Sequence, residues 1–168
     1  MIPDSDLQLR VVIKALSEVV APAIDATDRV AIEQLQLSLA TLSMLHSRLP
    51  LERRRVSKEL AHAINLATAT GQALGESPAI LSAALPTARA ALQNVDCDTA
   101  NLGALRRVLL SAVSACVDEL EQPALRRRIG RAVVVASEPA IELASAWCAQ
   151  AGFEADPARL GSLDHLLD

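Results

Sequence analysis

Apolar residues recur every three to four positions along most of the chain, which is the spacing that places side chains on one face of an α-helix. The first run follows Asp4 and Ser5, and either residue can cap a helix because its side-chain oxygen accepts from the backbone of the first turn. Pro22 is expected to end or bend this helix. Its apolar positions are Leu9, Val12, Ile13, Leu16, Val19 and Ala23.

A second helix is predicted from a cap at Asp25 or Thr27 to about Leu49, with leucines along one face. Pro50 stops it and opens a third helix, because proline is favoured in the first helical turn. The third helix is expected to break at residues 71–75, a segment that begins and ends with glycine. Its apolar face consists of Val56, Leu60, Ala63, Ile64 and Ala67.

A fourth helix is predicted after Ser77 and Pro78, with a kink at Pro86, and residues 94–101 are expected to form a polar connector. The fifth helix has the cleanest amphipathic pattern in the chain. Its inward positions are Leu102, Leu105, Leu109, Ala112, Cys116 and Leu120.

Pro123 opens a sixth helix, which the segment 137–139 is expected to restart or bend. Gly152 suits the C-terminal cap that follows, because glycine adopts the left-handed conformation without strain. A short tail helix is predicted over residues 156–167. The chain is therefore expected to end in a separate helical element.

The segments Pro50–Val56 (PLERRRV) and Pro123–Ile129 (PALRRRI) match in register. This match suggests two pseudo-symmetric three-helix repeats, residues 1–75 and 76–151, followed by the tail helix. The alternative is that arginine-rich helix starts arose independently in a sequence rich in Ala, Arg and Leu. Outside these blocks the identities are sparse.

The predicted fold is all-α, a six- to seven-helix bundle that forms a single domain over residues 1–168. The composition, 51% hydrophobic and 21% charged, offers enough apolar area to offset the entropy of ordering the chain. Because the chain has one Trp, one Phe and no Tyr, its core must consist mostly of small aliphatic side chains. Such side chains let helix backbones approach closely.

Charge and hydropathy exclude several classes of function. A net charge of −4 argues against a general nucleic-acid binder, which needs a clustered positive surface. Residues 1–6 lack the basic-then-apolar pattern of a secretory signal, and no run approaches the roughly 18 apolar residues of a membrane span. A cytoplasmic protein with neither nucleic acid nor membrane as a partner is expected.

Three cysteines without a Cys-x-x-Cys spacing indicate free thiols rather than a disulfide framework or a zinc site. Cys116 and Cys148 lie on apolar helix faces and are expected to be core thiols. No disulfide is therefore predicted.

Two arginine triplets lie near predicted helix N-termini, where the macrodipole disfavours cations. They are Arg53, Arg54 and Arg55, and Arg126, Arg127 and Arg128. One interpretation is an anion site at the end of the bundle, where the triplets grip a phosphate or a carboxylate. The other is that the arginines are solvated or paired with nearby glutamates, and this interpretation is favoured.

Glu59 and His62 have the Glu-x-x-His spacing of carboxylate-bridged di-iron bundles, but such a site needs a second copy, which the sequence lacks. A surface ladder of Arg55, Glu59 and His62 is the favoured interpretation. The sequence has no nucleophile elbow, phosphate-binding loop or zinc-protease motif. No catalytic residue, metal or cofactor is therefore expected.

An apolar interaction patch is predicted near the C-terminal end of the chain. Trp147 and Phe153 are expected to form one cluster. Three leucines of the tail helix, Leu160, Leu163 and Leu167, are expected to dock on that cluster or on another subunit.

These features together predict a non-catalytic helical interaction module that forms a homo-oligomer or docks on a partner protein. The reason is that the apolar helix faces exceed what a small monomer easily hides. The alternative is a binding protein, or a metal-free enzyme, that takes a small anionic metabolite in a pocket between helices. The sequence does not decide whether the protein is an enzyme, and the lack of a catalytic motif favours a protein without enzymatic activity.

Overall fold

The computed structural model describes residues 4–75, 78–149 and 160–168. All regular secondary structure in these ranges is helical, and no strand occurs in them. Six helices of at least 11 residues are present in the described part of the chain, together with shorter helical segments. The all-α prediction is confirmed.

The chain divides into two compact units, which are described separately. Unit 1 comprises Met1–Glu52 and Cys148–Ala155, and unit 2 comprises Arg53–Trp147 and Asp156–Asp168. The boundary after Glu52 does not coincide with the predicted repeat boundary after residue 75. A single domain and an internal repeat both stay predictions.

Unit 1 begins with helix α1 (Ser5–Ala15), which continues through a π-helical turn (Leu16–Val20) into the short α2 (Ala21–Ala23). Asp4 caps α1 by accepting a hydrogen bond from the backbone of its first turn, as its residue type predicts. The helical path ends just after Pro22, as the sequence predicts.

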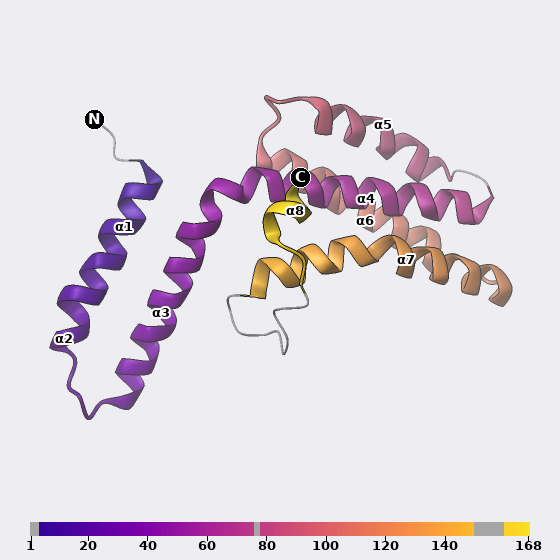
Figure 1. The fold of residues 1–168 in the computed structure, drawn as a ribbon. Coiled ribbons are helices and arrows are strands. Elements are labelled where there is room, and N and C mark those ends of the chain that lie inside the picture. The colour runs from indigo at the N-terminus through magenta and orange to yellow at the C-terminus, as the bar shows by residue number, and fades with distance from the viewer. Residues whose placement is uncertain (1–3, 76–77, 150–159) are drawn as a thin grey trace. The chain divides into compact units, whose positions relative to one another are not determined.

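Helix α3 (Arg29–Arg48) completes the described helices of unit 1 and lies beside α1 in the opposite direction (Figure 1). Its cap is Asp28, so the prediction of a cap at Asp25 or Thr27 is wrong. Asp25 instead accepts hydrogen bonds from the backbone and hydroxyl of Thr27, both at 2.8 Å, and these bonds lower its pKa. The two residues form the turn that precedes the cap.

Unit 2 contains α4 (Glu52–Leu74), α5 (Ala79–Gln93), α6 (Thr99–Asp118), α7 (Pro123–Cys148) and the short α8 (Leu163–Leu167). A 3-10 turn, Leu49–Leu51, precedes α4 and contains the proline that the sequence places there. Helices α4 and α7 run in opposite directions (Figure 1). The N-terminus of α4 and the C-terminus of α7 therefore lie toward the same end of unit 2.

The described core lies in unit 2 and consists of small and medium aliphatic side chains, as the composition predicts. Leu102, Leu109, Ala112 and Cys116 of the predicted inward face of α6 are buried, and Leu105 packs against the core. The largest fully buried apolar side chains are Leu60, Leu81, Leu102, Leu109, Ile129 and Leu143.

Two prolines lie inside continuous helices. Pro86 is within α5, and Pro139 is within α7, so α7 does not restart over residues 137–139, while the predicted bend there and the predicted kink at Pro86 stay predictions. Both prolines are exposed, and the residues four positions earlier are exposed as well, so water can donate hydrogen bonds to the carbonyls that a proline nitrogen cannot serve.

Helix ends show two further differences from the prediction. Helix α4 runs on through Gly71 to Leu74, and Gly75 follows it with a φ of 83°, a conformation that favours glycine. The predicted tail helix over 156–167 is not continuous, because residues 160–162 are not helical. Ser162 caps α8 instead, and residues 156–159 and Gly152 lie outside the described residues.

Among the described helices, α6 is long and apolar enough to cross a membrane by length and composition alone. The expectation that no segment approaches that length and hydropathy is therefore wrong for α6. Five of its residues contribute to the buried core of unit 2.

Candidate functional site

Arg53 anchors the start of α4 to the connector between α5 and α6. Its guanidinium donates hydrogen bonds to the backbone carbonyls of Val95 and Cys97. These acceptors are neutral, so the positive charge of Arg53 is not compensated by a carboxylate there. The sequence gives no signal for this pairing, because the partners lie more than 40 residues away.

The other two arginines of the first triplet form ion pairs. Arg54 pairs with the carboxylate of Asp168, after α8, and Arg55 pairs with Glu59 one turn along α4. The Arg55 guanidinium also lies over the ring of Trp147, 5.0 Å from its centroid. The interpretation of paired arginines is thus met at Arg54 and Arg55; Glu59 is a partner that the predicted ladder includes, whereas Asp168 was not expected.

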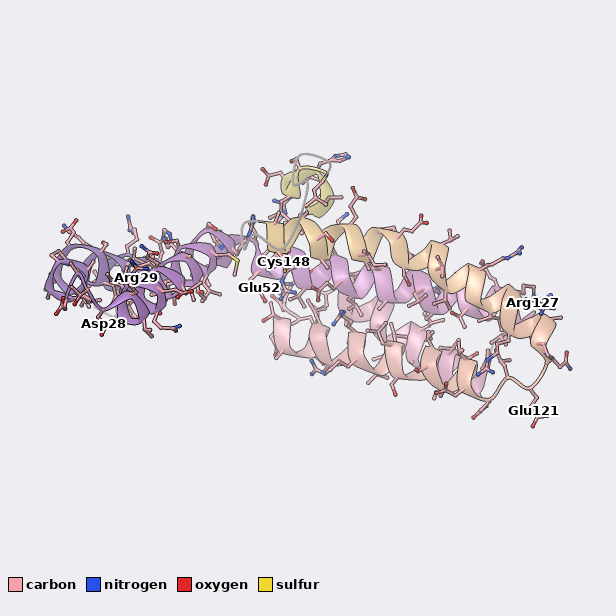
Figure 2. The ribbon with its side chains drawn as sticks, turned by 90° about the horizontal axis from the view of Figure 1, so that it is seen from below. Asp28, Arg29, Glu52, Glu121, Arg127 and Cys148 are labelled. Carbon is pink, nitrogen blue, oxygen red and sulfur yellow. The ribbon has the colours of Figure 1, made fainter. Side chains whose placement is uncertain are left out.

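The second triplet, Arg126 to Arg128, is exposed at the start of α7, and Figure 2 shows Arg127 at that end of unit 2. No ion pair of these three arginines occurs among the described residues. The Arg128 guanidinium lies 4.0 Å from the point where a Cβ at Gly75 would stand, so this triplet is close to the end of α4.

The two triplets do not converge on one site. The first triplet begins α4, and the second lies beside the end of the same helix, some 20 residues later. At 1.5 Å per residue the separation is about 30 Å, far beyond the reach of two arginines on one small anion. A shared anion site built from both triplets is excluded by this arrangement.

A basic cavity of about 360 Å³ lies beside the first triplet. Arg53, Arg54, Ser57 and Lys58 of α4 provide its polar wall. Its apolar wall is formed by Ala61, Leu92 and Leu167. Lys58 was not predicted from the sequence, although its position four residues after Arg54 places both on one helix face.

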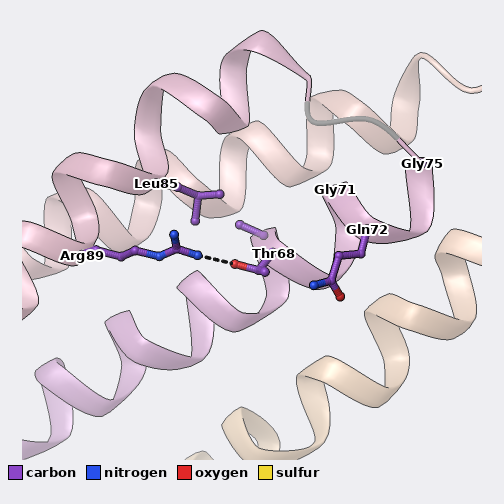
Figure 3. A pocket seen from close by; sticks show the side chains of 7 residues that line it. Thr68, Gly71, Gln72, Gly75, Leu85 and Arg89 are labelled. Carbon is purple, nitrogen blue, oxygen red and sulfur yellow. Dashed lines mark hydrogen bonds between the residues drawn. The ribbon is translucent and has the colours of Figure 1, made fainter.

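A second cavity, of about 490 Å³, lies between α4 and α5 (Figure 3). Arg89 reaches from α5 and donates a hydrogen bond to the Thr68 hydroxyl of α4 at 3.2 Å. Gly71 and Gly75 leave space along the α4 side, and Leu85 closes part of the opposite side. This cavity contains a single cationic group, and that group is already engaged.

A smaller cavity, of about 140 Å³, lies between α4, α6 and α7. Glu59 and His62 line it from α4, Arg106 from α6 and Ser137 from α7. Arg106 pairs with Glu59 at 3.6 Å, so Glu59 joins two arginines, Arg55 and Arg106. The charges around this cavity are therefore largely balanced.

His62 is not the surface residue that the predicted ladder requires. Its side chain is half-buried, and its Nδ1 atom is out of contact with solvent and has no hydrogen-bond partner among the described residues. Burial, followed by the nearby positive charge of Lys58, lowers the pKa of His62, and Glu59 opposes this shift. The ladder prediction holds for Arg55 and Glu59 but is wrong for His62.

We predict that His62 makes the protein less stable as the pH falls through the unperturbed histidine pKa of 6.5. The lowered pKa means that the unfolded chain binds a proton more readily than the folded one, so acid favours unfolding. The charged groups near His62 are Lys58 and Glu59 of α4 and Arg106 of α6.

Thermal unfolding of His62→Gln, followed from about pH 7.5 to 5.5, should show a smaller loss of midpoint than the original protein. His165→Gln is the matched control, because His165 is exposed on α8. Equal acid sensitivity of the original protein and His62→Gln would contradict the prediction.

The predicted C-terminal patch does not form an exposed surface in the described residues. Leu167 is buried and lines the basic cavity of its own chain, and Leu160 and Leu163 are half-buried. Trp147 is half-buried under Arg55, and Phe153 lies outside the described residues. Leu167 thus packs within unit 2, and the predicted docking of the tail leucines on the aromatic cluster or on another subunit stays a prediction.

The helices of unit 1 form a hairpin with one internal seam. Leu9 and Ile13 of α1 are half-buried, as are Leu35 and Leu39 of α3. At one end of the hairpin the His46 ring lies 2.7 Å from the Asp6 carboxylate. No residue in the described helices of unit 1 is fully buried.

One side of this hairpin is apolar. Val12 precedes the inward Ile13, and Leu45 precedes His46, so each is turned by 100° in the same sense about its helix axis. Because the helices are antiparallel and face each other, equal turns lead to the same side of the hairpin. The hairpin face, as we call it, consists of Val12, Leu16, Val20, Leu42, Leu45 and Leu49.

The π-helical turn decides which valine joins the hairpin face. Its wider spacing brings Val20 into line with Val12 and Leu16 and turns Val19 outward. The exposed fractions agree, at 40% for Val20 and 68% for Val19. The predicted place of Val19 on the apolar seam is therefore wrong.

Charged residues lie off the hairpin face. Arg10 and Lys14 of α1 and Glu33 of α3 are turned the other way from the seam by the same helical geometry. Among the positions that border the face, Gln8 and Ser38 are uncharged, whereas Arg48, one turn after Leu45, lies at its edge. The hairpin is thus a two-helix layer with one apolar and one charged side.

The thiols differ from one another in exposure. Cys97 and Cys116 are buried, and burial, followed by the charge of Glu119, raises the pKa of Cys116. Cys148 is exposed, so its predicted place in the core is wrong. No group of three or more His, Cys, Asp or Glu that could hold a metal ion occurs among the described residues.

Comparison of the chain with protein-family models, curated proteins and solved structures finds no match.

Proposed function

We propose that this protein is a non-catalytic interaction module that self-associates through the hairpin face. The observation that supports the proposal is the combination of an apolar, charge-free side with the lack of any fully buried residue in the described helices of unit 1. Exposed leucines and valines gathered on one side of a helix pair are typical of an interaction surface.

The two helices need a further partner to be stable. Most helical stability in proteins comes from packing an amphipathic face rather than from the intrinsic propensity of the residues. The seam between α1 and α3 leaves its residues only half-buried. Packing a second layer on the hairpin face would complete the burial of both helices.

A second copy of the same hairpin fits this requirement. Two copies related by a twofold axis would form a four-helix bundle with a shared apolar interior. Because the hairpin face carries no charge, two identical faces meet without repulsion. Helices about 30 Å long and side by side offer roughly 600 Å² per partner, or about 1,200 Å² in total, which is at the lower limit of specific interfaces.

Sedimentation velocity tests this proposal by comparing the original protein with a variant that has charges introduced on the hairpin face. The original protein is expected to sediment as a monomer–dimer equilibrium that shifts toward dimer as its concentration rises. The double variant Val12→Glu/Leu45→Glu should remain monomeric, because a dimer would bury its unpaired carboxylates. Far-UV circular dichroism checks that the variant is still helical.

The matched control is Val11→Glu/Leu37→Glu, which places the same charges on the same two helices. Val11 and Leu37 are exposed and directed away from the hairpin face. The control should dimerise like the original protein. If the original protein is a monomer at every concentration, or if both variants lose the dimer equally, self-association through this face is refuted. The hairpin face would then be covered by a different partner protein or by another part of the same chain.

A further inference from the structure

The basic cavity beside α4 has an excess of positive charge that its surroundings do not neutralise. Arg53, Arg54 and Lys58 line it, and Asp168, through Arg54, supplies the one ion pair to these three groups among the described residues. Arg53 donates to neutral carbonyls, and Lys58 has no carboxylate within ion-pair distance in the described chain. Two positive charges are thus left without a carboxylate partner among the residues that the structure describes.

Lys58 is the most informative of the three cations. Its side chain is only half-exposed, so part of its hydration is lost without an opposite charge in return. Arg53 and Arg54 also lie in the first turn of α4, where the helix dipole is repulsive to cations. An anion in the cavity would relieve both costs, since a helix N-terminus and basic side chains favour the same negative charge.

The other cavities do not combine these features. The cavity between α4 and α5 contains one cation, Arg89, which is bonded to Thr68. In the cavity of His62, Glu59 balances the positive charge of Arg106. Of these three cavities, the basic cavity is therefore the one whose described residues leave positive charge for an anion to neutralise.

The far wall of the basic cavity limits the kind of anion that fits. Ala61, Leu92 and Leu167 present hydrocarbon to the space, and Leu167 is only 4% exposed. A volume of about 360 Å³ falls within the range of small-molecule sites and exceeds the size of a bare phosphate or carboxylate. A ligand with an anionic head and a short hydrocarbon tail fits the cavity, because its head can contact the basic wall and its tail the apolar wall.

We propose that this cavity binds an amphiphilic anion, with a carboxylate or phosphate head on Arg54 and Lys58 and an alkyl tail against Leu92 and Leu167. Without such a ligand, the Asp168 carboxylate forms the ion pair with Arg54 that the head group would form. Binding then exchanges an ion pair within the chain for one with the ligand. The site shares no residue with the hairpin face, so the test of ligand binding is independent of the test of self-association.

Isothermal titration calorimetry with octanoate and octyl phosphate, on the full chain, tests the site. Saturable binding is expected for at least one of the two probes, and the preferred probe identifies the head group. Inorganic phosphate and octanol should bind much more weakly, because each lacks one half of the ligand. Equal binding of octanol would show a merely apolar cavity and overturn the proposal, as would the absence of binding by both anionic probes.

Variants of Arg54 and Lys58 locate the binding. Arg54→Gln and Lys58→Gln should each weaken binding about tenfold or more, since hydrogen bonds to charged groups are the stronger kind. Asp168→Asn removes the competing carboxylate and should tighten binding. Arg127→Gln and Arg128→Gln, which change the second triplet, are the matched controls and should leave the affinity unchanged. Equal losses in all four arginine and lysine variants would refute this location.

Discussion

Replacing Leu109 with Ala is expected to lower the free energy of unfolding by about 2–5 kcal/mol. Leu109 lies in α6 and is 0% exposed, so truncation removes buried hydrocarbon and leaves a cavity in the core of unit 2. The prediction is checked by urea denaturation followed by circular dichroism, with the midpoint compared at constant slope.

The matched control is the neighbouring residue of the same helix. Val108 is 52% exposed, so Val108→Ala should change the free energy of unfolding by less than about 0.5 kcal/mol. A Leu109→Ala variant as stable as Val108→Ala would mean that α6 does not pack as described.

Replacing Ala88 with Leu is expected to lower the free energy of unfolding by about 1–3 kcal/mol, although leucine is a good helix former. Ala88 lies in α5, is 0% exposed and belongs to the core. A larger side chain there must push neighbouring helices apart or adopt a strained rotamer. Thermal unfolding measured by calorimetry reports the loss.

Ala90→Leu provides the comparison, because Ala90 is exposed on the same helix two residues later. It adds the same atoms with the same helix propensity but meets no neighbour, so its unfolding midpoint should stay close to that of the original protein. If both leucine variants unfolded alike, close packing of small residues would not be what holds α5 in place.

Local chemistry made most of the helices predictable from the sequence. The cap at Asp4 and the inward face of α6 follow from hydrogen-bonding capacity and from the helical period, both of which act over a few residues. The cap at Asp28 was missed because Asp25 offers an equally suitable oxygen, and only the turn with Thr27 decides between them.

The prolines were harder to predict because their effect depends on exposure. Pro86 and Pro139 lie on exposed helix positions, where water compensates for the missing hydrogen bond and burial elsewhere keeps the helix continuous. The sequence alone does not reveal that exposure. The π-helical turn that reorients Val19 and Val20 was equally invisible to a constant 3.6-residue period.

The candidate site was predictable only in its residue types. The arginine triplets indicated anion chemistry, but their tertiary contacts decide which of them belong to a site: Arg54 meets Asp168 across 114 residues of chain. The antiparallel course of α4 and α7 then separates the two triplets. Lys58 and Leu167 join the basic cavity through packing, which spacing along the sequence does not encode.

Hydrogen exchange measured as a function of protein concentration tests self-association through the hairpin face most directly. If two copies pair there, the backbone amides of α1 and α3 should exchange more slowly as the concentration rises, while those of α4 and α6 should not change. Exchange of α1 and α3 that is independent of concentration would contradict the proposal.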